Sequence, residues 1–512
     1  MGAASSRSPE ITAARRRVVG VLRRHAGIGM LLGVGVVLRV LFMIAYRPAF
    51  WFHGDSGVYL NLAGSALAPH PTRPLGYPVL LKLLAPTGTH LAVVAVQHLL
   101  SLLLALTVYL LLQRRGLSRR LCCLAAAPLL FDSLILTTGH YLLPDMLFTA
   151  LFAGAVVLLL GPGTPGHPAV IGAGLLIAAA WITKPTALPV ALLLGLYLLV
   201  RRVGWRRLVG YALGFTIPYV GLLVWIGDRP SVYGSQSGTA LYGRAAIIAD
   251  CDRLRLTDRE RVACPDQPLG QRWDRADAFF WRRPARLNDV YTEAGAQRLV
   301  DFAVTVVRQQ PLDYLRIVGK ESAAHFVPGL YLGPMNECLR ERLVPPAAFR
   351  GTQRLPDRCP PAQGAANFGG GATWPGAAPE GTVLTTGLHR YGELLRVVPI
   401  VLLVGVLLTL AALVVRRRRV DGIRPPGVRV DARVRLDLVL LMLAGPGLTV
   451  LTVAVGMYEP RYALPALPLS AIAAALAWHG LTTRPADAPP PVTIPATREP
   501  ERRDSLSSAI YS

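Results

Sequence analysis

An apolar run near the start of the chain, residues 28–46 with the sequence IGMLLGVGVVLRVLFMIAY, is closely followed by a polar stretch. The polar stretch, Trp51–Pro78, has the sequence WFHGDSGVYLNLAGSALAPHPTRPLGYP and carries one acid, Asp55, and one arginine, Arg73. About twenty apolar residues are needed to cross the hydrocarbon core of a membrane. The run 28–46 therefore predicts a first membrane span, and the polar stretch predicts a loop outside the membrane.

The segment before this span, residues 1–27, is rich in arginine. Basic residues beside a span favour the cytoplasm, so we expect a cytoplasmic N-terminus and a span that leaves outward. The run is long and ends in bulky residues, whereas a signal peptide has a short apolar region ending at small residues. We therefore expect the first span to be retained.

Similar apolar runs recur along the whole chain, which has 512 residues, 52% of them hydrophobic and 16% charged. This composition excludes a soluble globular protein and predicts an all-α polytopic membrane protein, because helices satisfy their own backbone hydrogen bonds in lipid. Residues 75–84 are too few to span and predict a helix at the interface. We expect about ten transmembrane helices, at residues 28–46, 90–112, 121–139, 146–160, 168–182, 187–200, 207–227, 396–415, 436–457 and 462–479.

The formal net charge of +24 could indicate either nucleic-acid binding or membrane topology. The arginines gather in connections that the ten spans would place in the cytoplasm, for example in 114–120 and 416–419. The positive-inside rule predicts this distribution. We therefore expect contact with membrane lipids and no nucleic-acid partner.

The predicted spans divide the rest of the chain into parts. Residues 28–227 hold seven spans and a first external loop, 47–89; residues 228–393 are polar and predict an external loop domain; residues 394–481 hold three spans. The Pro-rich tail 482–512 is predicted to be disordered in the cytoplasm. Richness in Arg and Ala is typical of a high-GC bacterium, so we expect a multi-pass protein of the bacterial plasma membrane.

Four of the six cysteines fall in the predicted external loop domain: Cys251, Cys264, Cys338 and Cys359. Four cysteines allow three pairings, and the short separations favour Cys251–Cys264 and Cys338–Cys359. Such bridges persist in an oxidising compartment, in agreement with a location outside the cytoplasm. Free thiols are the alternative, and the lack of C-x-x-C spacing argues against structural zinc.

Charged residues stand at the turns that this topology places outside the membrane: Asp55, Arg73, Asp145, Lys184, Glu459 and Arg461. Each alone has the ordinary interpretation of a solvated interfacial residue. Charges at a membrane are costly unless they face water, a cavity or a partner, and here acids and bases share one side. That arrangement suits a membrane-anchored anionic substrate, because bases hold a phosphate while an acid takes a proton from a nucleophile.

Five short motifs make this hypothesis more specific. They are Asp55 with Tyr59, Arg73-Pro74-Leu75-Gly76-Tyr77-Pro78, Pro144-Asp145, Thr183-Lys184-Pro185-Thr186 and Glu459-Pro460-Arg461-Tyr462. Their order resembles that of the polytopic glycosyltransferases that use polyprenyl-phosphate sugars, namely the protein O-mannosyltransferases and the lipid A aminoarabinose transferases of the GT-C architecture. The resemblance covers most of residues 28–480, whereas 228–393 matches nothing in that family.

The resemblance implies a GT-C-like enzyme of the cell envelope that moves a sugar from a polyprenyl-phosphate donor to a hydroxyl of a protein, glycan or lipid acceptor on the external face. It implies Asp55 as the general base, and inversion of the anomeric centre. The donor phosphate would be bound by Arg73, Lys184 and Arg461. The substrate pocket would include Tyr59, Tyr77, Asp145, Glu459 and Tyr462, although for the first two tyrosines the more common role is to anchor the membrane interface.

We expect no cofactor. The protein O-mannosyltransferases begin this loop with an Asp-Glu pair, but Ser56 follows Asp55 here and His53 has no visible partner ligands, so the sequence does not support a divalent metal. The alternative to an enzyme is a transporter or flippase for an anionic or polyprenyl-linked lipid. Transporters typically show internal repeats and midplane sites, and neither is evident, so the sequence favours the enzyme.

Overall fold

The computed structural model describes residues 24–52, 54–233, 238–349, 381–414 and 431–482. Within these residues the regular structure is helical, apart from one isolated bridge between Phe50 and Tyr141. Most of the predicted basic N-terminus and nearly all of the predicted tail lie outside the described residues.

Five described segments are long and apolar enough to cross a membrane. They are α2 (Ala26–Ala45), α5 (His90–Arg114), α11 (Trp205–Ile226), α18 (Val383–Leu394) with α19 (Val398–Val414), and α20 (Ala432–Met442) through α21 (Leu448–Val455). A sixth arises if α6 (Arg119–Phe131) and α7 (Ser133–His140), which meet at a bend of 43°, count as one span. The prediction of a helical membrane protein is confirmed.

Four further apolar helices are shorter. They are α8 (Asp145–Leu159), α9 (His167–Thr183), η2 (Pro185–Ala187) with α10 (Leu188–Val200), and α22 (Ala466–Thr482). Together with the five long segments and the bent pair they make ten apolar helical segments among the described residues, and each overlaps one predicted span; α18 is additional, because nearly all of it falls in the predicted loop domain 228–393. Because helices of 15 or 17 residues fall short of the usual spanning length, the number of ten spans stays a prediction.

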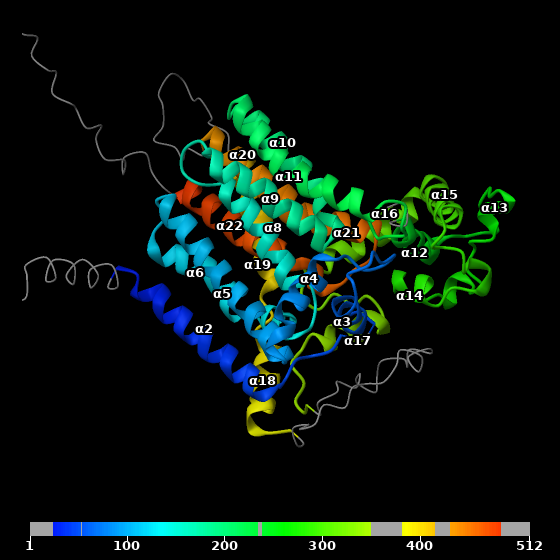
Figure 1. Cartoon of the computed structure of the whole chain (residues 1–512), viewed down its shortest axis with the longest axis horizontal. Helices are drawn as coiled ribbons and strands as arrows, with labels where there is room; N and C mark the ends of the chain where they lie inside the picture. The colour runs from blue at the N-terminus through cyan, green and yellow to red at the C-terminus, as the bar shows by residue number, and fades with distance from the viewer. Residues whose placement is uncertain (1–23, 53, 234–237, 350–380, 415–430, 483–512) are drawn as a thin grey trace, which may run out of the picture.

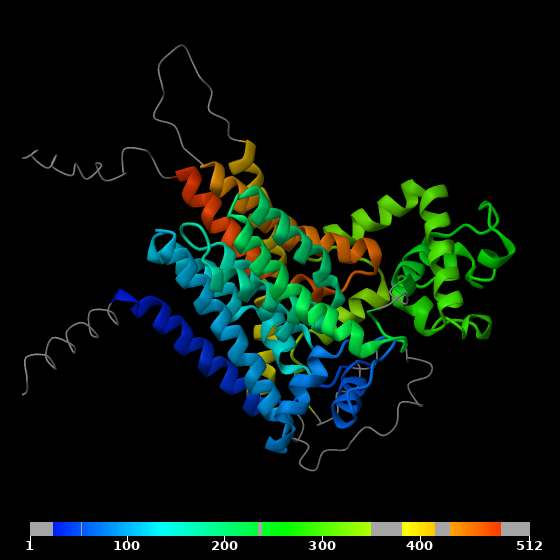
Figure 2. The same cartoon turned by 45° about the horizontal axis from the view of Figure 1, so that its top comes forward.

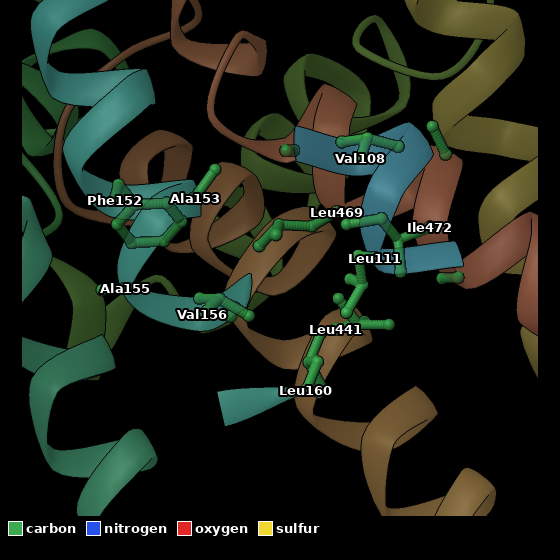
Figure 3. Close-up of a cluster of buried hydrophobic side chains, with 14 of the residues drawn as sticks. Val108, Leu111, Phe152, Ala153, Ala155, Val156, Leu160, Leu441, Leu469 and Ile472 are labelled. Carbon is green, nitrogen blue, oxygen red and sulfur yellow. The ribbon is translucent and has the colours of Figure 1, made fainter. Parts of the chain in front are cut away.

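The core of the membrane helices is built around α22 and α8. Figure 3 shows Val108 of α5, Phe152 of α8 and Leu469 and Ile472 of α22 in one cluster, and the buried set continues onto α9 and α20. Small residues let α22 approach its neighbours closely: a Cβ added to Gly405 of α19 would lie 2.9 Å from Ser470. Close approach through small residues is typical of helix packing in membranes.

Two buried charges hold the break between α6 and α7. Asp132 accepts backbone hydrogen bonds from Leu134 and, with its other oxygen, from Val397 at 2.7 Å, so that it caps α7 and the start of α19 together. On the other side of the break, Arg39 of α2 donates to the carbonyls of Leu129 and Leu130 at the end of α6. The negative charge thus lies at helix N-termini and the positive charge at a C-terminus, as the helix dipoles favour.

The stretch Trp51–Pro78 folds into two short helices, α3 (Ser56–Gly64) and α4 (Gly76–Leu84). The second coincides with the short helix predicted at residues 75–84, and a 3₁₀ turn, η1 (Ala85–Thr87), follows it. A Cβ on Gly76 would lie only 2.4 Å from the hydroxyl of Thr183, so α4 rests directly on the end of α9. The loop that carries Asp55 and the turn that carries Lys184 are therefore packed together.

Residues 238–349 form a further helical part, which we call the helical region; most of it lies at one end of the membrane helices (Figures 1 and 2), and Leu339 and Leu343 near its end pack against Phe42 of α2 and Leu136 of α7. It has its own core, centred on Phe279, Leu299, Phe302 and Val306. The last three of these residues come from its longest helix, α15. Its helices are α12 (Gly238–Ile248), α13 (Asp258–Arg261), η4 (Leu269–Gln271), α14 (Ala276–Trp281), η5 (Ala285–Leu287), α15 (Glu293–Gln309), α16 (Pro311–Ala323) and α17 (Pro334–Arg342).

Three of the four cysteines of the predicted external loop domain lie within the described residues. Cys251 and Cys264 are joined by a disulfide with a Cα–Cα distance of 6.2 Å. Of the second favoured pair, Cys359 lies outside the described residues, so the structure gives no geometry for its pairing with Cys338. Cys122 and Cys123 are free thiols in α6.

At the opposite end of the membrane helices, three arginines surround one acid. Arg115, which follows α5, forms a 2.7 Å ion pair with Asp437 of α20. The Asp437 carboxylate also accepts from Tyr197 of α10, whose hydroxyl accepts from Arg201. Arg433 donates to the carbonyl of Gly161 just after α8. This end of the helices is therefore basic, and α8 runs from here to Asp145.

Candidate active site

All six charged residues that the sequence analysis selected lie at one end of the membrane helices. They come from different elements and sit at helix ends or in connections. Asp55 precedes α3, Arg73 precedes α4, Asp145 begins α8, Lys184 lies between α9 and η2, and Glu459 and Arg461 lie at η8 (Pro460–Ala463).

Five of these side chains form a continuous chain of ion pairs, which we call the charge chain: Arg73, Asp55, Arg461, Asp145 and Lys184. Asp55 accepts from Arg73 at 2.5 Å and, on its other oxygen, from Arg461 at 3.0 Å. Arg461 uses its second terminal nitrogen to reach Asp145 at 3.1 Å. Lys184 completes the chain at 2.6 Å from Asp145. Arg461 is thus the cation that joins the two acids.

Glu459 extends this arrangement toward the helical region. One of its carboxylate oxygens lies 3.6 Å from Nε of Arg461, and the other accepts from Arg275 at 3.2 Å. Arg275 directly precedes α14, and the sequence analysis did not select it. No motif marks it, because it lies 184 positions from Glu459 in a part of the chain without any recognised pattern.

The charge chain is buried at Arg461 and Asp145 and partly exposed at Arg73, Asp55 and Lys184. The side chains of Asp145 and Glu459 are 1% exposed and that of Arg461 is 7% exposed, whereas those of Asp55 and Lys184 are each 17% exposed. Buried charges are costly unless they are paired and hydrogen-bonded. The chain meets this condition by alternating its signs; together with Glu459, Arg275 and Asp277 it holds four bases and four acids.

Asp55 is ionised in this setting. Burial by itself would raise the pKa of Asp55, but the positive charges of Arg73 and Arg461 outweigh it and hold that pKa below its ordinary value. Both carboxylate oxygens are occupied by guanidinium donors. Each oxygen keeps a second acceptor site, but the two guanidinium groups disfavour protonation of Asp55 as long as both face it.

Aromatic rings line the cationic side chains. The ring of Phe52 lies 4.4 Å from the guanidinium carbon of Arg461, and the ring of Tyr462 lies 5.2 Å from Nζ of Lys184. The ring of Trp281, from the helical region, lies 5.5 Å from Arg73. Cation–π contacts of this kind strengthen with desolvation, so the rings help to keep unpaired faces of these cations in a poorly hydrated site.

The two predicted tyrosines of the first loop are both buried. Tyr59 and Tyr77 pack edge to face at 5.4 Å. Tyr77 is fully buried, and its hydroxyl donates to Gln97 of α5, whose amide in turn holds the carbonyl of Tyr141. Neither ring lies at the molecular surface, so the alternative of an interfacial anchor does not describe them. Tyr77 helps to fix the loop against the membrane helices.

Among the described residues no group of three or more His, Cys, Asp or Glu side chains is placed to hold a metal ion. His53 lies outside the described residues. The two acids of the charge chain, Asp55 and Asp145, both pair with the guanidinium of Arg461.

Comparisons with known proteins add no information about this site. The charge chain, its aromatic neighbours and its link to Arg275 come from residues spread between positions 52 and 462. The likeness to polyprenyl-phosphate-sugar glycosyltransferases stays a prediction from short motifs. No family model, no curated protein and no solved structure matches this chain.

Proposed function

We propose that this chain is an integral membrane glycosyltransferase that moves a sugar from a polyprenyl-phosphate donor to an acceptor hydroxyl on the external face of the plasma membrane. The observation that carries the proposal is the charge chain, in which a carboxylate, Asp55, lies between two guanidinium groups at one end of a set of apolar helices. The donor's leaving group is a phosphate, and guanidinium groups bind phosphate well.

The topology that goes with this proposal has ten spans, a cytoplasmic N-terminus and an external helical region. The basic end near Arg115 and Arg201 would face the cytoplasm, in agreement with the positive-inside rule. Helix α8 has 15 residues, and such a helix rises about 22 Å, less than the roughly 30 Å hydrocarbon core. Asp145, at its other end, would lie recessed below the external surface, where a membrane-anchored donor can reach it.

The proposed chemistry is a single displacement. The acceptor oxygen attacks the anomeric carbon and a carbon–oxygen bond forms, while the bond from that carbon to the phosphate oxygen breaks. The acceptor proton passes to Asp55, and polyprenyl phosphate leaves as an anion with the bonding electrons. Attack opposite the leaving group inverts the anomeric centre. Arg73, Lys184 and Arg461 would stabilise the charge that develops on the phosphate.

The resting ion pairs suggest how Asp55 becomes a base. A donor phosphodiester has two non-bridging oxygens and one negative charge, as a carboxylate has, and can therefore compete with Asp55 for Arg73 and Arg461. Once one guanidinium turns to the phosphate, an oxygen of Asp55 is free and its pKa rises from its depressed value. The base is then available when the donor is present.

The test is sugar transfer from a labelled polyprenyl-phosphate-sugar pool by membranes that contain the wild type or Asp55→Asn. Loss of a general base costs about 10²–10⁴-fold in rate, so we expect transfer by the wild type and a loss of that size in the variant. Asp266→Asn is the matched control, because this acid lies in an exposed pair with Arg286 in the helical region.

Equal transfer by wild type and Asp55→Asn would remove Asp55 from the role of base. If a broad donor pool gives no transfer at all, the enzyme proposal fails. The remaining candidate is then movement of the lipid itself, which a flipping assay in vesicles would detect.

A further inference from the structure

The connection between α21 and η8, residues 456–459, is held by the helical region at every residue. Gly456 accepts from Arg244 at 3.1 Å, and Met457 lies 3.4 Å from a terminal nitrogen of Arg275. The amide of Tyr458 donates to Glu321 at 2.8 Å. Glu459 pairs with Arg275. We call these four residues the strap.

The groups that hold the strap are themselves fixed. Arg244 is fully buried and forms a two-pronged pair with Glu321, at 2.7 and 2.6 Å, which locks α12 to α16. Arg275 is 4% exposed and uses its Nε to bind Asp277 at 3.0 Å. Paired guanidinium and carboxylate groups of this kind have defined geometry. The strap therefore rests on a rigid surface of the helical region.

The strap ends two residues before Arg461, the cation that joins Asp55 and Asp145. Arg461 has three carboxylate neighbours, namely Asp55, Asp145 and Glu459. Glu459 competes with the two aspartates for the guanidinium of Arg461. Glu459 is held back by Arg275, so that it stays 3.6 Å from Nε of Arg461 while the two terminal nitrogens reach Asp55 and Asp145. Without Arg275, the buried carboxylate of Glu459 would keep Arg461 at 3.6 Å and the charge of the nearby Arg342 to balance it.

We propose that Arg275 is a positioning residue, which anchors Glu459 and thereby keeps the guanidinium of Arg461 between Asp55 and Asp145. This inference rests on the proposed function, since it assigns the helical region a part in the same reaction. The inference assigns the helical region a function that its sequence does not reveal. Through the strap, the helical region sets the position of Arg461, the cation that would bind the phosphate.

The first test compares Arg275→Gln and Arg275→Lys with Arg286→Gln, which removes an exposed ion pair from the same region. Misplacement of a catalytic group by about 1 Å can cost about 10²-fold in rate, so we expect a loss of that order in kcat for Arg275→Gln. Arg275→Lys restores the charge beside Glu459 and recovers most of the rate. Arg286→Gln behaves as the wild type does.

Two readouts separate positioning from a general loss of structure. In Arg275→Gln, Arg461 moves toward Glu459 and away from Asp55, so the acidic limb of the pH–rate profile moves to higher pH; a structural defect lowers the rate equally at all pH values. The double variant Arg275→Gln/Glu459→Gln is no slower than Arg275→Gln alone, because coupled residues are not additive.

Hydrogen exchange decides the inference even if the proposed function fails. We expect faster amide exchange across residues 456–464 in Arg275→Gln than in the wild type or Arg286→Gln, with α15 unchanged. If the wild type transfers no sugar, the proposed function falls, and the exchange result alone judges the link from Arg275 to Arg461. Unchanged exchange across 456–464, or a rate loss that is equal at all pH values, overturns the inference.

Discussion

Asp55 is held between two guanidinium groups, and this fixes how its charge responds to pH. Its pKa in the folded protein lies below the ordinary value of 3.8, since the attraction of Arg73 and Arg461 exceeds the cost of burial. A depressed carboxyl pKa contributes stability that is fully present above the ordinary pKa and is lost as pH falls through the folded value. At neutral pH the carboxylate is therefore both ionised and stabilising.

Arg73→Gln tests this arrangement. Removing one of the two guanidinium groups should raise the pKa of Asp55. The acidic limb of the pH–rate profile of the remaining activity should therefore move to higher pH. The folded protein should also gain less stability between low and neutral pH than the wild type does, as measured by thermal unfolding in detergent. Arg316→Gln, in an exposed pair with Asp313, is the control. An unmoved acidic limb would contradict the assignment of Asp55 as the base.

At the scale of elements, the break between α6 and α7 depends on Asp132. Its two oxygens cap two different helices, one through Leu134 and Ile135 and the other through Val397 and Val398. Loss of an N-cap costs about 0.5–2 kcal/mol, so Asp132→Ala should destabilise the fold by roughly 1–4 kcal/mol for two caps. Asp132→Asn keeps one acceptor oxygen and should fall between Ala and wild type in thermal unfolding. Equal midpoints for all three would contradict the double cap.

The contact between α4 and α9 gives a second prediction at this scale. A Cβ at position 76 would lie 2.7 Å from Cα of Thr183, so Gly76→Ala must push the two elements apart. Overpacking of this kind costs about 1–3 kcal/mol, and the shift displaces the neighbouring Lys184. We expect lower sugar transfer and a lower unfolding midpoint for Gly76→Ala. Gly64→Ala in α3, with no heavy atom within 4 Å of its added Cβ, should match the wild type.

The sequence predicted the helical segments well, because each is an apolar run bounded by charged or Pro-containing turns. It also grouped Asp55, Asp145, Lys184 and Arg461, since ends of alternate spans share one membrane side. It did not predict which acid meets which base, because the lateral order of helices is set by packing. Arg39 and Arg275 were missed for a related reason: their partners are distant backbone carbonyls and a distant carboxylate, which leave no local pattern.

At the scale of the whole molecule, two cores are linked at the strap, and a third cluster packs Leu339 and Leu343 of the helical region against Phe42 and Leu136 of the membrane helices. The membrane helices have the core around α22, and the helical region has the core around Phe302. The strap is the covalent link through which contacts of the helical region reach Arg461. Damage to the helical region should therefore lower transfer without unfolding the membrane helices.

The disulfide allows a test of this independence. Closing a loop of 13 residues stabilises a fold by about 3 kcal/mol, so Cys251→Ser with Cys264→Ser should loosen the helical region. We expect faster hydrogen exchange in α12 and α15, unchanged exchange in α22, and reduced transfer. Cys123→Ser, which removes a free thiol, is the control. Equal acceleration in α22 would show that the two cores unfold together.

The ion pair between Arg461 and Asp55 joins residues 406 positions apart. A ribosome adds about 5–20 residues per second, so roughly 20–80 s separate the synthesis of these two residues. During most of that interval the nascent chain contains both Asp55 and Asp145 without the cation that joins them. A chain that stops before residue 461 can insert most of its helices yet never assemble the charge chain. If the proposed function holds, products truncated before Arg461 would therefore transfer no sugar.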